Sequence, residues 1–276
     1  MGTLYLVATP IGNLEDMSLR AVRILKEVVL IAAEDTRHTG KLLKHFGIQT
    51  PLRSYFEHNK LARQSGILER LADGDVALVS DAGTPAINDP GYELVKGALE
   101  AGFPVLPVPG ASAPIAALTV SGLPTDSFLY LGYLPHKAGD RRRALRHVQA
   151  QPYTLIFLES PHRITGALED MLEELGDRRI LVAREMTKMF EEYWRGPLGA
   201  ALEYFRAQPA RGEFTLVVEG RSREGVGRWT EDQLLDSIRK GLKEGISASQ
   251  LAGDLAERSG WKKREVYHLV NNRKDE

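Results

Sequence analysis

The chain has 276 residues, of which 43% are hydrophobic and 26% charged, as in an ordinary soluble protein with room for two domains. Its 36 basic and 37 acidic side chains leave a net charge of −1, which excludes a generally cationic nucleic-acid binder and leaves only local patches. The absence of cysteine excludes disulfides and thiolate metal sites, and no apolar run approaches membrane-spanning length. We therefore expect a cytoplasmic protein with no metal and no membrane partner.

The first hundred residues alternate short apolar runs with amphipathic segments. We expect strands at Leu4–Ala8, Val28–Ala33, Leu52–Tyr55, Val76–Val79 and Pro104–Val108. Helical patterns lie at Leu19–Lys26, Thr39–Phe46, Lys60–Ala72, Tyr92–Ala101 and Ala113–Val120. This alternation predicts a mostly parallel sheet with helices on both faces.

A second α/β unit follows a break near Gly122–Thr125. We expect its strands at Phe128–Tyr133, Thr154–Leu158, Ile180–Ala183, Glu192–Trp194 and Phe214–Val218. Its helices are expected at Gly139–Gln149, Arg163–Leu175 and Leu198–Arg206. The successive short strands from Ile180 onward predict a mixed sheet, so this half is not a copy of the first. The pattern predicts an α/β domain over residues 1–122 and a second over 123–220.

The character of the chain changes after Gly220. Residues 221–228 are polar and glycine-containing and indicate a linker. In residues 229–276, Thr230 and Gln233 have the spacing of a capping box. Two short helices, Ile246–Arg258 and Lys262–Asn271, then give a helix-turn-helix spacing that any antiparallel helix pair can also show. Two roles remain open for residues 229–276: an RNA-docking or assembly element, or a plain structural cap.

Polar loops follow four of the early strands: Thr9–Asn13, Glu34–His38, Ser80–Gly91 and Pro109–Ser112. Strands of a parallel sheet end at one edge, where open α/β sheets bind ligands, so the four loops together favour a binding cleft. Each loop alone could be an ordinary strand-to-helix connection.

The loops differ in the chemistry that they can carry. Thr9–Asn13 lacks the lysine and repeated glycines of nucleotide-binding loops. Glu34–His38 combines two carboxylates, a guanidinium and an imidazole, which can accept a proton, hold a ribose and its phosphate, or merely cap the next helix. We expect Asp81 to accept hydrogen bonds from a ligand and Asp89, before Pro90-Gly91, to cap the next helix.

Charged clusters also end strands in the second unit, at Glu159–Arg163 and Ala183–Lys188. The segment His136–His147 has an excess of four positive charges. It is a candidate phosphate-contacting patch, with a solvated helix face as the alternative.

These segments, in this order, closely resemble the tetrapyrrole-methylase-like superfamily of S-adenosylmethionine-dependent enzymes over nearly the whole chain. The runs Ala-Glu-Asp-Thr-Arg-His-Thr-Gly and Ser-Asp-Ala-Gly-Thr-Pro resemble the branch that methylates small-subunit ribosomal RNA. The resemblance implies two α/β domains with S-adenosylmethionine in the cleft between them. It also implies a homodimer that methylates the ribose 2′-oxygen of a cytidine in the decoding region of 16S rRNA.

By motif position, the resemblance implies cofactor contacts at Ile11, Asp81, Thr84, Ser112, Ala113, Leu158 and Met186. It places an acid–base aspartate at Asp35, our first candidate for the base that deprotonates the ribose, with His38 and Glu185 as alternatives. The cations expected to hold the RNA phosphates are Arg37, Arg141, Arg142, Arg163 and Lys188.

Two other functions remain open. The same fold could methylate a tetrapyrrole or a modified protein side chain. A DNA-binding regulator built on the helix-turn-helix is the other, although the nine basic and nine acidic side chains of residues 229–276 count against it.

Overall fold

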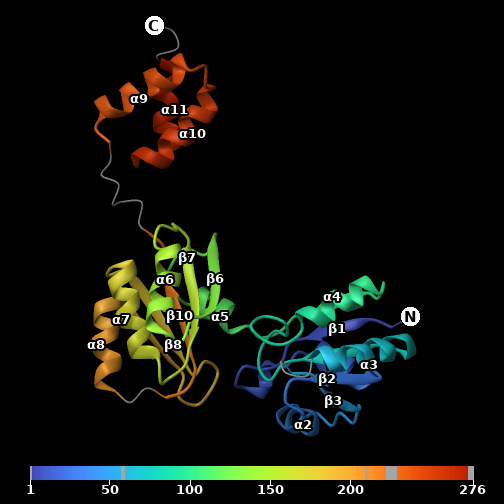
Figure 1. Ribbon diagram of the computed structural model, residues 1–276. Coiled ribbons are helices and arrows are strands. Elements are labelled where there is room, and N and C mark those ends of the chain that lie inside the picture. The colour runs from blue at the N-terminus through green and yellow to red at the C-terminus, as the bar shows by residue number, and fades with distance from the viewer. Residues whose placement is uncertain (1, 57–59, 209–210, 222–228, 273–276) are drawn as a thin grey trace. The chain divides into compact units, whose positions relative to one another are not determined.

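The computed structural model describes residues 2–56, 60–208, 211–221 and 229–272 and divides the chain into two compact units (Figure 1). The larger unit comprises residues 1–149 and 153–219, and the smaller comprises 150–152 and 220–276. Both expected α/β domains lie in the larger unit, each built on its own sheet. Apart from Arg221, the expected linker lies outside the described residues. No helix in the described part of the chain has the length and apolar character needed to span a bilayer.

The first sheet is parallel throughout, with strand order β3-β2-β4-β1-β5, which confirms the expected topology. Its strands are β1 (Leu4–Val7), β2 (Leu30–Ala33), β3 (Leu52–Ser54), β4 (Val76–Val79) and β5 (Val105–Val108). The helical segments between them are η1 (Leu14–Asp16), α1 (Leu19–Glu27), α2 (Thr36–His45), α3 (Lys60–Asp73) and α4 (Tyr92–Glu100).

Helices cover both faces of this sheet because alternate strand residues point to opposite sides. On β2, Ile31 packs in the cluster that holds buried residues of α1 and α2, whereas Leu30 packs in the cluster formed with α3 and α4. Helix α2 begins at Thr36, three residues earlier than the hydrophobic pattern indicates, because the Asp35 carboxylate accepts the backbone N–H of Arg37 and caps it.

The second sheet has the order β6-β7-β10-β8-β9. Its strands are β6 (Phe128–Tyr133), β7 (Thr154–Glu159), β8 (Arg179–Arg184), β9 (Glu192–Pro197) and β10 (Phe214–Val218). Only β6 and β7 are parallel, and the other neighbours are antiparallel. The expected mixed sheet is therefore confirmed.

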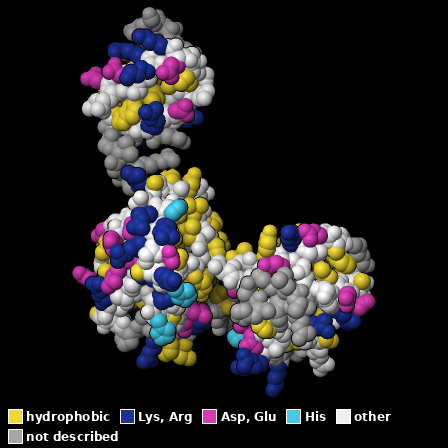
Figure 2. Space-filling view, viewed as in Figure 1, with side chains coloured by type: hydrophobic (Ala, Val, Ile, Leu, Met, Phe, Trp, Pro, Cys, Tyr) yellow, Lys and Arg dark blue, Asp and Glu magenta, His cyan; other side chains and the backbone are white. Residues whose placement is uncertain are grey.

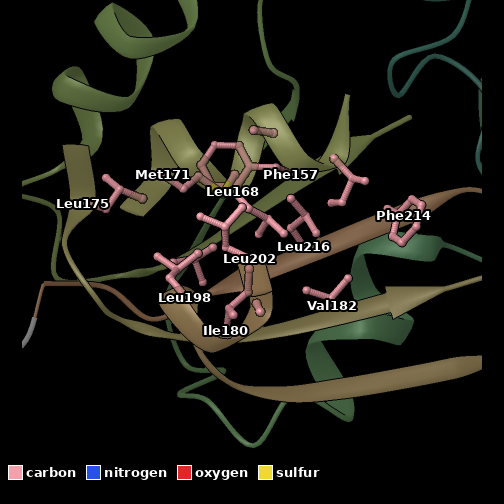
Figure 3. Packing of buried hydrophobic residues seen from close by; sticks show 14 of the residues in the cluster. Phe157, Leu168, Met171, Leu175, Ile180, Val182, Leu198, Leu202, Phe214 and Leu216 are labelled. Carbon is pink, nitrogen blue, oxygen red and sulfur yellow. The ribbon is translucent and has the colours of Figure 1, made fainter. Parts of the chain in front are cut away.

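Three helices cover one face of the second sheet: α6 (Ala138–Val148), α7 (Ile164–Leu175) and α8 (Leu198–Ala207). Figure 3 shows Phe157 and Leu216 of the sheet among Leu168 of α7 and Leu202 of α8. The opposite face is covered by α5 (Ala113–Thr119), which follows β5 in the chain yet packs on the second sheet. Helix α5 therefore joins the two sheets before the boundary expected at residue 122.

The smaller unit contains α9 (Glu231–Lys243), α10 (Ala248–Ser259) and α11 (Lys263–Asn272) around a core of its own. The capping box of Thr230 and Gln233 is confirmed. Gly260, at a φ of +69°, ends α10 in the left-handed conformation that glycine adopts easily. The expected helix pair with a tight glycine turn is thus confirmed.

The arginines of α6 face carboxylates of α7. The Nε atoms of Arg141 and Arg142 donate to the two oxygens of Asp170, each at 2.6 Å, and the Arg141 side chain is only 10% exposed. Arg142 also pairs with Glu173, and Arg146 with Glu174. On this face, basic and acidic side chains lie interspersed (Figure 2). The structure therefore contradicts the expected RNA contact of Arg141, which is buried and paired, and leaves the α6 patch largely neutralised.

Replacing Asp170 by alanine would leave the buried Arg141 guanidinium without its counter-charge. We expect Asp170→Ala to lower the free energy of unfolding by about 3–5 kcal/mol, measured by chemical denaturation. The control Arg143→Ala, whose side chain is 68% exposed, should change it by no more than about 0.5 kcal/mol. Equal effects of the two variants would contradict a stabilising role for the buried pair.

Candidate functional site

Hydrogen bonds join the four polar loops at the carboxyl edge of the first sheet. Thr9 and Gly83 exchange backbone N–H···O bonds of 2.9 and 3.0 Å. The Asp35 backbone N–H donates to Asp81 Oδ1 at 3.1 Å, and the Thr84 hydroxyl donates to the Ala111 carbonyl at 3.3 Å. The Ser80–Gly91 loop therefore contacts each of the other three.

These loops and the facing edge of the second sheet enclose a cavity of about 260 Å³, here called the first cavity. All seven residues expected to contact the cofactor line it: Ile11, Asp81, Thr84, Ser112, Ala113, Leu158 and Met186. The structure also places there several residues that the family motifs did not assign to the cofactor, among them Glu34, Asn88, Asp89, Tyr130, Tyr133 and Glu213.

The cap expected of Asp89 is wrong. Gly91 is the N-cap of α4 and no side chain caps that helix, while Asp89 lines the first cavity. The loop around it is tightly wound, because Ala86 and Asn88 adopt φ values of +67° and +62°, which are costly for residues other than glycine. This backbone path turns the Asp89 carboxylate toward the cavity and away from the helix.

Four carboxylates line the first cavity: Glu34, Asp81, Asp89 and Glu213. Burial raises the pKa of Glu34, and the nearby charge of Asp89 raises it further. Burial likewise raises the pKa of Asp89, with a hydrogen bond from Ser80 opposing the shift and the charge of Asp81 adding to it. Negative charge at this site is therefore costly without a ligand, and a cationic ligand would relieve it.

The first cavity fits S-adenosylmethionine by the chemistry of its lining. Its carboxylates suit a sulfonium and an ammonium group, and its apolar side chains suit the flat faces of an adenosine. Ser112 is the N-cap of α5, yet its hydroxyl makes no capping bond and is left for a ligand. Among the described residues, no group of three or more His, Asp or Glu side chains is arranged to hold a metal ion.

A second cavity of about 540 Å³ shares Ile11, Asp81, Ala82 and Glu213 with the first. Its other walls include Thr9–Gly12, the α2 residues His38 and Lys41, and Lys188. His38 and Lys41 are three residues apart and so lie on one face of α2. The second cavity thus carries an imidazole and two ammonium groups beside the carboxylates of the first.

Asp35 lines neither cavity. Its carboxylate accepts hydrogen bonds from the backbone N–H of Arg37 at 2.8 Å and from that side chain at 2.7 and 3.1 Å. These bonds hold the pKa of Asp35 well below its usual range, whereas a general base works best with a pKa near the operating pH. The arrangement favours the capping alternative for Asp35, and the Arg37 side chain remains 89% exposed.

Glu185 is occupied in holding Lys188. The Lys188 ammonium donates to Glu185 Oε1 and Glu213 Oε2, each at 3.0 Å. Partial burial acts to raise the pKa of Glu185, but the hydrogen bonds from Lys188 and from the backbone N–H of Glu213 outweigh it, so the pKa is lowered. Gly212 makes this contact possible, because a Cβ there would lie 2.3 Å from Glu185 Cγ. Glu185 is therefore placed to position Lys188 at the wall of the second cavity.

Arg163 and Arg142 lie in structural contacts. The Arg163 guanidinium lies 3.3 Å from Glu159 Oε2, donates to the Leu134 carbonyl, and belongs to a side chain that is 17% exposed. Of the five cations expected to hold phosphates, only Lys188 lines the second cavity. Lys41 belongs to none of the sequence motifs, and its helical spacing from His38 is the signal that could have revealed it.

The chain matches known proteins over nearly its full length. A family model described as Tetrapyrrole (Corrin/Porphyrin) Methylases matches residues 3–202. A Synechocystis sp. protein named ribosomal RNA small subunit methyltransferase I is 49% identical, covering 98% of this chain and 97% of the relative. Proteins of the same name are 47% identical in Halalkalibacterium halodurans (98% and 95% covered) and 46% identical in Escherichia coli O157:H7 (96% and 93%).

Solved structures support the fold. The methyltransferase CobJ superposes with a TM-score of 0.60 at 21% identity, covering 80% of this chain and 95% of that one. A uroporphyrin III C-methyltransferase from Thermus thermophilus gives 0.56 at 22%, covering 79% and 97%. Together with the near full-length relatives, these matches confirm the expected resemblance. The chain therefore belongs to the tetrapyrrole methylase family and, within it, to the ribosomal RNA small subunit methyltransferase I group.

Proposed function

We propose that this chain transfers the methyl group of S-adenosylmethionine to the ribose 2′-oxygen of a cytidine in the decoding region of 16S rRNA. Its relatives bear the name ribosomal RNA small subunit methyltransferase I. The observation that carries the proposal is a carboxylate-lined cavity that shares a wall with a cation-lined one. The proposal includes action in the cytoplasm and as a homodimer, as the family resemblance implies.

The direct test is methyl transfer to small ribosomal subunits isolated from cells that lack this protein. We expect one ribose methyl group in 16S rRNA, located by mass mapping. A porphyrinogen offered under the same conditions should remain unmethylated, and preferential methylation of the porphyrinogen would contradict the proposal.

The first cavity would bind the cofactor, which supplies an electrophilic methyl group on a positively charged sulfur. Glu34, Asp81 and Asp89 would stabilise the positive charges of the cofactor. The hydroxyls of Thr84 and Ser112 would form hydrogen bonds with it. The apolar lining would exclude water from the reacting atoms.

The second cavity would hold the ribose. In-line displacement requires the acceptor oxygen to approach the methyl carbon where the two cavities meet. Side chains of the second cavity must therefore hold the ribose in that position. His38 lines the second cavity, whereas Asp35 and Glu185 are engaged elsewhere, so His38 is our candidate for the base that removes the 2′-hydroxyl proton. Lys41 and Lys188 would contact the flanking phosphates.

Asp81→Ala should weaken S-adenosylmethionine binding because it removes a hydrogen-bond acceptor and a negative charge from a preformed loop. Calorimetry should show an affinity loss of roughly 10-fold or more, since hydrogen bonds to charged groups are worth about 1.5–3 kcal/mol. Asp73→Ala, on the exposed surface of α3, is the matched control. Unchanged affinity in Asp81→Ala would refute the role.

Cofactor affinity should rise with pH through the raised pKa values of Glu34 and Asp89. A protonated carboxyl is neutral and cannot stabilise a sulfonium, so binding below these pKa values must release protons. Calorimetry in buffers of different ionisation heat would measure that release. Asp89→Asn should reduce the number of protons released, and the same number in variant and wild type would contradict the assignment.

His38→Gln should lower kcat for ribose methylation by about 10²–10⁴-fold while leaving cofactor affinity unchanged. Asp35→Asn is the informative comparison, because asparagine also caps helices well and should leave most of the activity. A larger loss in Asp35→Asn than in His38→Gln would return the role of base to Asp35.

A further inference from the structure

Two large apolar side chains project from the turn between β8 and β9. Met189 is 90% exposed and Phe190 74% exposed. Single exposed apolar residues are common on protein surfaces, but two adjacent ones at a turn form a patch that needs an explanation. Neither residue belongs to the core clusters of the described chain.

The backbone beneath this pair is held in place. Glu185 and Thr187 adopt φ values of +49° and +65°, conformations that persist only where the surroundings enforce them. The Glu191 carboxylate accepts the Thr187 backbone N–H at 2.8 Å and the Tyr193 hydroxyl at 2.6 Å. Met189 and Phe190 thus project from a fixed base, which limits the entropy lost when they bind a partner.

The pair directly follows a residue of the second cavity in the chain. Lys188, directly before Met189, lines that cavity. Gly12, from the first polar loop, packs so closely here that a Cβ would lie 2.5 Å from Lys188 Cγ and 2.7 Å from Thr187 Oγ1. The exposed pair is therefore anchored next to a residue that lines the cavity that we assign to the ribose.

We propose that Met189 and Phe190 stack against bases of the substrate RNA beside the target cytidine. When the cytidine enters the second cavity, these two side chains fill the space that the cytidine leaves in the RNA. This inference rests on the proposed function. A base must leave its stack before its ribose can enter a cavity, and apolar or aromatic side chains can replace the lost stacking. Stacking tolerates any base, while Lys41 and Lys188 supply the charge that suits an RNA backbone.

The test compares Phe190→Ala, Phe190→Trp and wild type in methylation of unmethylated small ribosomal subunits. We expect Phe190→Ala to raise KM for the subunit by about 5- to 100-fold, the range for losing one base–aromatic stack, with unchanged affinity for S-adenosylmethionine. Phe190→Trp keeps a stacking ring and should restore KM to near the wild-type value. Leu99→Ala removes another exposed apolar side chain, at the far end of α4, and should leave KM unchanged.

Three outcomes separate the possibilities. A KM of Phe190→Ala equal to that of Leu99→Ala would overturn the inference while leaving the proposed function intact. A lower molecular mass of Phe190→Ala by sedimentation would also overturn it, since the pair would then be a contact between copies of the chain. Wild-type protein that fails to methylate the subunits would refute the proposed function itself.

Discussion

The parallel order of the first sheet is the constraint on which the site depends. Because β1, β2, β4 and β5 all run in one direction, their four loops leave at a single edge. The Ser80–Gly91 loop bonds to each of the other three, so its costly backbone conformations at Ala86 and Asn88 are supported from several sides. The parallel strands and the hydrogen bonds between loops thus hold the polar site in place.

The mixed second sheet supplies the opposite wall through its antiparallel strand. Strand β10 runs against β7 and β8, so Phe214 at its start pairs with Glu159 and Arg184 at their ends. This register brings Glu213 and Phe214 to the edge where Leu158 and Met186 lie. Helix α5 follows the last strand of the first sheet and packs on the second sheet. Ser112 and Ala113, at the start of this helix, therefore lie where the chain passes from one sheet to the other. Both sheets therefore line the first cavity.

Carboxylates line both cavities, whereas cationic side chains and an imidazole line only the second, an arrangement that suits two different ligands. The first gathers carboxylates, of which Glu34 and Asp89 have pKa values raised mainly by burial, and the second adds His38, Lys41 and Lys188 to the carboxylates that it shares with the first. Two of the other cations that the sequence offers for phosphate binding, Arg141 and Arg142, are neutralised by Asp170. Charge at the site is thus local, which agrees with the near-zero net charge of the whole chain.

The linear pattern was sufficient for most features that depend on neighbouring residues, although it misplaced the cap of α4 and the start of α2. Apolar runs identified the strands to within a few residues, the β–α alternation predicted the parallel sheet, and the Thr230–Gln233 spacing predicted a capping box. The family motifs selected seven residues that surround one cavity. These successes share a cause: the alternation of side chains along a strand, helix caps and loop motifs each depend on residues that are close together in the sequence.

Tertiary structure decided which partner each charged side chain meets. Asp81 accepts the backbone N–H of Asp35 from another loop, Asp89 lines the first cavity, and Arg141 is buried against Asp170, 29 residues away. The residue type of an aspartate or arginine does not show whether its side chain is paired, buried or free. The pKa of the side chain and the groups that it contacts depend on neighbours that only the folded chain brings near. The sequence by itself therefore determined the sheets, the four loops and the family, and only the folded structure separated the residues available for chemistry from those that hold the fold together.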